Sequence, residues 1–76
     1  MEILNEYKNG HEGNDCWIDN YVCLIRLDFR LYLVIHTETV SGSWTGNPKT
    51  TKTHTFENYD EALTCMIILV EKLERE

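Results

Sequence analysis

The most constraining feature of this sequence is a strict alternation of apolar residues between Tyr21 and Ile35. The odd-numbered residues of this stretch are all apolar: Tyr21, Cys23, Ile25, Leu27, Phe29, Leu31, Leu33 and Ile35. A period of two is typical of β-strands, in which successive side chains point to opposite faces of the sheet. Because most strands run about 3–10 residues, a stretch of this length predicts a hairpin rather than one strand.

The expected hairpin spans about residues 20–40 and turns at residues 28–30. A three-residue loop pairs Ile25 with Leu33 and keeps the odd-numbered residues on one face, whereas a two-residue loop breaks this match. The same register pairs Leu27 with Leu31 and Cys23 with Ile35. One continuous bent strand is the alternative, since neither Gly nor Asn marks the turn.

Weaker patterns flank the hairpin. Residues 1–7 alternate enough to predict an edge strand, and residues 8–15 are rich in turn formers, which predicts a loop. Another strand is expected at about residues 50–56, where a Thr-rich alternating segment follows Pro48.

The C-terminal segment predicts one amphipathic helix at about residues 59–75. Asn58 is a favoured N-cap residue, and Glu61 follows at the spacing of a capping box. Apolar residues at helical spacing share one face: Tyr59, Leu63, Met66, Ile67, Val70 and Leu73. The expected fold is therefore a single α+β domain, residues 1–76, in which an antiparallel meander of three or four strands packs one face against this helix.

One helix covers only one face of a sheet, and the odd-numbered face of the hairpin suits it best. The even-numbered face then needs another cover, because it holds Val22, Leu24, Tyr32 and Val34. With Ile68 and Leu69 of the helix, these four residues are the predicted protein-binding surface. Burial under the N-terminal segment is the alternative.

Thirteen acidic residues oppose seven basic ones, which gives a formal net charge of −6. This charge disfavours nucleic acid and anionic membranes as partners. A segment without acidic residues, from Trp44 through Lys49 and Lys52 to His54, is the one candidate contact with nucleic acid. The plainer interpretation is a solvated hairpin arm.

No residue spacing in the chain predicts chemistry. The three cysteines and three histidines form neither a CxxC nor an HxxxH pair, so we expect no metal and no cofactor. No phosphate loop or nucleophile elbow is present, so an enzyme is not expected. The three cysteines, without a signal peptide at the start, predict free thiols in the cytoplasm, and the longest apolar run, 65–70, falls short of the roughly 20 residues that span a membrane.

These observations together predict a non-enzymatic protein-binding module. By analogy of size and fold, it is expected to be a small acidic inhibitor or adaptor of phage or mobile-element type that binds a larger protein. Nucleic-acid contact through residues 44–54 and a homodimeric structural or accessory protein are the two alternatives.

Overall fold

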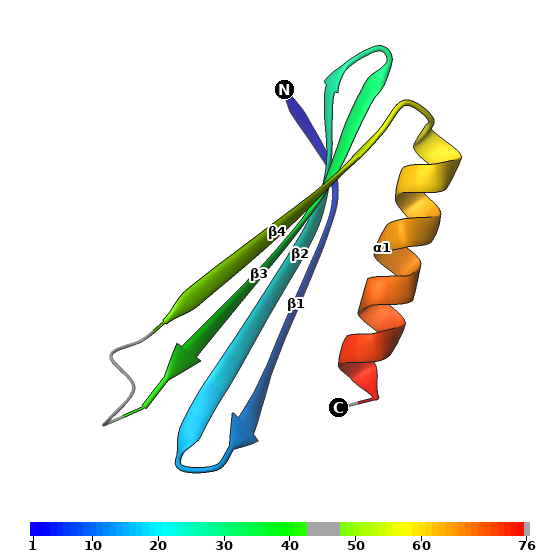
Figure 1. The fold of residues 1–76 in the computed structure, drawn as a ribbon. Helices are drawn as coiled ribbons and strands as arrows, with labels where there is room; N and C mark the ends of the chain where they lie inside the picture. The colour runs from blue at the N-terminus through cyan, green and yellow to red at the C-terminus, as the bar shows by residue number, and fades with distance from the viewer. Residues whose placement is uncertain (43–47, 76) are drawn as a thin grey trace.

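The described residues form one sheet and one helix. The computed structural model describes residues 1–42 and 48–75. The elements are β1 (Glu2–Gly13), β2 (Cys16–Asp28), β3 (Leu31–Ser41), β4 (Lys49–Phe56) and α1 (Tyr59–Glu74). The strands pair antiparallel in the order β1-β2-β3-β4, and α1 lies along one side of the sheet (Figure 1). The predicted α+β meander with a C-terminal helix is confirmed.

The β2–β3 hairpin has the predicted register away from the turn, but the predicted pairing of Leu27 with Leu31 is wrong. Cys23 pairs with Ile35 and Ile25 with Leu33, as the alternation requires. The turn itself contains two residues rather than three, because Asp28 pairs with Leu31 and the register shifts between Arg26 and Asp28. Leu27 is thus the extra residue of a β-bulge, which absorbs the odd residue that the prediction assigned to the loop.

β1 is longer than predicted, and the loop expected at residues 8–15 is wrong. The strand continues to Gly13, which pairs with Cys16 across a turn at Asn14 and Asp15. Only the two turn residues leave the ladder, since Asp15 adopts a φ of 57° and Asp tolerates the left-handed region better than most residues do. The polar residues of this segment are therefore strand residues at the edge of the sheet.

Helix α1 begins where its N-cap predicts. The Asn58 side chain accepts hydrogen bonds from the backbone N–H groups of Asp60 (2.7 Å) and Glu61 (3.4 Å). These contacts satisfy two of the donors that the first turn of a helix leaves free. At the other end, the Arg75 N–H donates to the carbonyl of Lys72.

The helix covers the even-numbered face, which corrects the predicted assignment of the two faces. Val22, Leu24 and Val34 are fully buried. They pack with residues of α1 in one core cluster, whose buried helical members are Ala62, Met66 and Leu73. Tyr32 lies partly buried beside this core and stacks edge-on against Tyr59, with ring centroids 5.9 Å apart. The side chains expected to form a partner surface are thus the hydrophobic core.

The outer strands explain why α1 selects this face. On its side of the sheet they contribute Leu4 and Tyr7 from β1 and Phe56 from β4, all packed against the core. On the opposite side β1 contributes Glu6 and Lys8, which pair with Cys23 and Tyr21, while β4 contributes mainly threonine. Because large apolar side chains lie at both margins, the even-numbered face can pack against the whole length of the helix. Burial of apolar area drives this packing.

The helix is also rotated relative to the predicted apolar stripe. Ala62, Met66 and Leu73 face the sheet, whereas Ile67 is 48% exposed and Tyr59 is 42% exposed. The buried stripe is centred on Ala62. The predicted stripe contained only large apolar residues and so omitted this alanine, whose small side chain allows the helix to approach the sheet closely.

Candidate functional site

One face of the sheet has no cover from the described elements. Its centre includes six apolar side chains from three adjacent strands: Ile3 of β1, Tyr21, Cys23 and Ile25 of β2, and Leu33 and Ile35 of β3. We call this set the open face. In Figure 1, α1 lies on one side of the sheet, and no other described element lies on the opposite side. An apolar sheet face of this extent on a small protein is typical of a contact surface.

The burial of the open face comes from strand neighbours within the sheet. Cys23 and Ile25, on the inner strand β2, are nearly buried between side chains of β1 and β3. Tyr21, Leu33 and Ile35 are partly exposed, and Ile3 at the margin is half exposed. A flat surface approaching the face would therefore meet a continuous apolar layer rather than isolated side chains.

The thiol at the centre of the open face is not an activated nucleophile. Burial raises the pKa of Cys23, and the neighbouring Glu6 carboxylate raises it further, while the Tyr21 hydroxyl opposes the rise. Burial likewise raises the pKa of Cys65 in α1. Reactive cysteines have lowered pKa values, so these two thiols act as small apolar side chains.

Trp17 extends the open face toward the β1–β2 turn, which the sequence analysis did not anticipate. Its indole Nε1 donates to Asp19 Oδ1 at 2.7 Å. The ring lies across Gly10, where a Cβ would sit 2.7 Å from the indole Cζ2. The sequence contains a signal for this position, since Trp17 and Asp19 continue the odd-numbered positions of β2 upstream of Tyr21. The loop predicted at residues 8–15 led to an alternation that began only at Tyr21.

The charges at the margin of the open face are mixed. Strand residues whose side chains lie on this side are the acidic Glu6, Glu12, Asp19 and Asp28 and the basic Lys8 and Lys49. Four acids against two lysines leave a net charge of −2, compared with −6 for the whole chain. The Lys8 ammonium also lies over the ring of Tyr21, 5.8 Å from its centroid. Most of the acidic excess of the protein therefore lies elsewhere.

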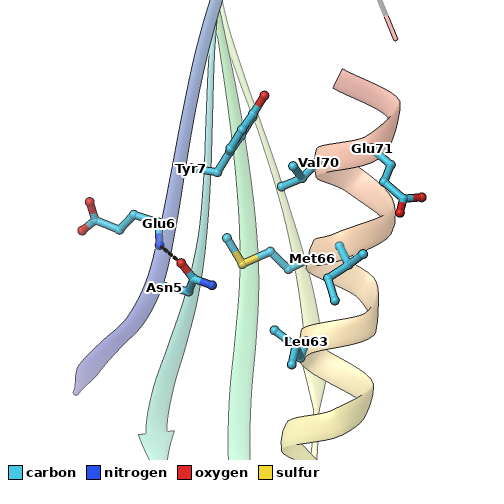
Figure 2. Close-up of a pocket in the computed structure, with 8 residues that line it drawn as sticks. Asn5, Glu6, Tyr7, Leu63, Met66, Val70 and Glu71 are labelled. Atoms are coloured by element: carbon cyan, nitrogen blue, oxygen red, sulfur yellow. Dashed lines mark hydrogen bonds between the residues drawn. The ribbon is translucent and has the colours of Figure 1, made fainter. Parts of the chain in front are cut away.

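A second apolar surface is a groove of about 230 Å³ between β1 and α1. Its apolar lining comes from Tyr7 of β1 and from Leu63, Met66, Ile67 and Val70 of α1. Figure 2 shows Tyr7 and Met66 directed into the gap, whereas the carboxylates of Glu6 and Glu71 point away from it. Since ligand pockets usually span about 300–1,000 Å³, this groove suits one apolar side chain of a partner rather than a cofactor.

Polar residues border the hydrophobic core near the C-terminus of α1. Asn20 is 2% exposed, and its Oδ1 lies 2.9 Å from His36 Nε2. Asn9 Nδ2 donates to the Leu73 carbonyl at 3.3 Å and to the Tyr7 hydroxyl. Within the described part of the chain, Asn20 Nδ2 and His11 Nδ1 are buried without a hydrogen-bond partner. Of these contacts, the hydrogen bond from Asn9 to the Leu73 carbonyl joins β1 to the last turn of α1.

The structure divides the predicted nucleic-acid segment between the two sides of β4. Lys52 and His54 pair with His36 and Val34, so their side chains lie on the α1 side. Lys49 pairs with Thr39 and lies on the opposite side. Trp44 falls outside the described residues. The three described residues therefore do not combine into one basic surface.

The remaining predicted site residues lie on α1. Ile68 is 49% exposed on the outer surface, whereas Leu69 is partly buried against the core. They share no surface with Val22, Leu24 and Val34, which are buried. Across residues 1–42 and 48–75, no three His, Cys, Asp or Glu residues come together as a group that could hold a metal ion.

In comparisons with known proteins, no family model, no curated protein and no solved structure matches this chain. In the described ranges, the single helix α1 is neither long nor apolar enough to cross a membrane.

Proposed function

We propose that this protein is a non-enzymatic protein-binding module and that the open face is its contact surface. The observation that carries the proposal is the apolar layer of β2 and β3 on the side of the sheet opposite α1. Small monomeric proteins rarely leave such a layer in water, because burying apolar area lowers the free energy at about 25 cal/mol per Å².

The mixed charge of the open face defines the kind of partner. A face with net charge −2 fits a flat, apolar and weakly charged protein surface, rather than the strongly basic surface that the overall charge of −6 favours. The expectation of an inhibitor or adaptor of phage or mobile-element type, acting in the cytoplasm, stays a prediction of the sequence.

The test is affinity capture from a lysate of the source cells with the tagged protein. We expect the wild type to retain a protein partner and Ile35→Lys to lose it, because a lysine on the open face places a charge in an apolar contact. Ile68→Lys is the matched control, since Ile68 is exposed on the outer surface of α1.

The salt dependence of capture separates the two kinds of partner. A weakly charged contact should persist between about 0.05 M and about 0.5 M salt, whereas a contact with a basic surface should weaken strongly. Capture that survives Ile35→Lys and is lost with Ile68→Lys would refute the proposal. Circular dichroism of each variant establishes that it is folded.

A further inference from the structure

We infer that the protein covering the open face is a second copy of this chain, in a symmetric homodimer whose two sheets pack face to face with the helices outward. This inference rests on the proposed function and names its partner. It follows from the area of the face, the distribution of charge and the symmetry that a homodimer requires.

The area of the face fits a stable dimer. The four strands contain 12, 13, 11 and 8 residues, a mean of 11, and at about 3.3 Å per residue, with strands about 4.8 Å apart, the sheet covers roughly 700 Å². A standard interface buries about 800 Å² on each partner. Two copies of this chain therefore come close to that area with one face each, without a contribution from α1.

The distribution of charge favours the same pairing. Five acidic residues lie on α1 or in the segment before it, namely Glu57, Asp60, Glu61, Glu71 and Glu74, against the basic Lys72 and Arg75. Contact through the helices would bring these acidic surfaces together. Contact through the open faces instead separates the helices by two sheet layers, roughly 30 Å in all, well beyond the Debye length of about 8 Å.

The open face also has the composition that a two-fold interface requires. In such an interface the same surface contributes from both subunits, so it must be complementary to itself. An apolar centre on β2 and β3 meets an identical centre, and the margin offers charges of both signs, Glu6 beside Lys8, together with neutral threonines of β4. If the margin carried charges of only one sign, it would repel the same margin of the second copy. The margin of the open face carries charges of both signs and therefore does not.

The closing experiment measures molar mass by light scattering from about 1 µM to about 200 µM protein, a range that lies at or above the Kd values, roughly µM to pM, of standard-size interfaces. We expect a species of about 18 kDa, twice the 9.0 kDa of the chain. A wild type that stays at 9.0 kDa throughout overturns the inference, and this readout depends on no variant.

Two threonines of β4 give a matched pair of variants. Thr53 pairs with Ile35 and lies on the open side, whereas Thr50 pairs with Glu38 and lies on the α1 side, and both are exposed. We expect Thr53→Lys to raise the Kd of the dimer at least tenfold and Thr50→Lys to change it less than twofold. A dimer that responds equally to both, or responds only to Ile68→Lys, overturns the inference.

The outcomes also separate this inference from the proposed function. A monomeric wild type that captures a different protein through Ile35 overturns the homodimer and supports the binding module. A monomer that captures nothing overturns both.

Discussion

At the scale of single residues, a few side chains decide where the strands end and how they turn. Asp15 supplies the left-handed residue of the β1–β2 turn, with a φ of 57°. At the β2–β3 turn, the Asp28 carboxylate accepts the N–H of Arg30 at 3.2 Å, and the bulge at Leu27 sets the register. These local features are encoded by residue type, since short polar side chains stabilise turns through bonds to nearby backbone.

Asp15 gives a test of the turn. We expect Asp15→Val to lower the free energy of unfolding by about 1–2 kcal/mol, because a β-branched residue is strained at positive φ. Asp15→Gly should leave it unchanged or raise it by up to about 1 kcal/mol, since glycine adopts this conformation freely. Urea denaturation measures both values. Equal stability of the Val and Gly variants would contradict the assigned geometry.

The buried thiols predict a loss of stability at alkaline pH. Burial raises the pKa of Cys23 and of Cys65 above 9.0, the ordinary value. As pH rises, the unfolded chain therefore ionises its thiols before the folded chain does. The stabilisation from these groups is present below the unfolded pKa and is lost as pH increases through the folded pKa.

We expect the free energy of unfolding to fall from about pH 8.5 upward. A Cys23→Ala, Cys65→Ala variant should show a shallower fall, because it has no buried thiol to ionise. Urea titrations at a series of pH values measure both slopes. Identical slopes for the wild type and the double variant would show that these thiols do not cause the effect.

At the scale of elements, the helix and the strands depend on different signals. Asn58 starts α1 through contacts within three residues, so the N-terminus of the helix follows from local sequence. The strands depend on pairing, because β1 runs to Gly13 only where it has β2 beside it. Polar residues from 8 to 13, which favour a loop when considered alone, form an edge strand when that pairing exists.

The cap of α1 is tested at Asn58. We expect Asn58→Ala to lower the free energy of unfolding by about 1 kcal/mol, because two backbone donors of the first turn lose their acceptor. Asn58→Asp should keep most of the stability, since its carboxylate accepts the same bonds and favours the helix dipole. Thermal and urea denaturation give the comparison, in which equal values for Ala and Asp would count against the cap.

The assignment of the two faces is tested by a pair of leucines. Leu24 is fully buried under α1, whereas Leu33 is partly exposed on the open face. We expect Leu24→Ala to cost about 2–5 kcal/mol and Leu33→Ala to cost less than half as much. Denaturation is followed at low protein concentration, where self-association does not contribute. A larger cost at Leu33 would reverse the assignment.

At the scale of the whole molecule, two layers and a small core set a thin margin of stability. A chain of 76 residues buries only about 60% of the surface that its unfolded state exposes, and here one sheet face has no cover from the described elements. A second copy on that face would bury it in the manner of a β-sandwich. In the proposed dimer, binding and stability are therefore coupled.

That coupling predicts a melting temperature that depends on protein concentration. We expect the Tm of the wild type to rise by a few degrees for each tenfold increase in concentration, because dimerisation stabilises only the folded chain. Thr53→Lys should melt at a lower temperature than the wild type at each concentration, because its dimer is weaker. Differential scanning calorimetry gives both curves, and a constant Tm for the wild type would contradict the coupling.

Local patterns in the sequence were enough to predict the central hairpin and the helix. The period-two alternation predicted the hairpin and the pairing of Ile25 with Leu33, and Asn58 with the i, i+3, i+4 spacing predicted α1. These signals are local because strand alternation and helix capping each depend on residues that are close in the chain.

Only the tertiary structure decided which face α1 covers and which face stays open. Both faces of the hairpin are apolar at their centre, so the alternation alone could not separate them. The decision came from the outer strands, which place Tyr7 and Phe56 on one side and Glu6 and threonines on the other. That placement depends on the register of β1 and β4, which pairs residues far apart in the chain, and so it becomes visible only when the sheet is assembled.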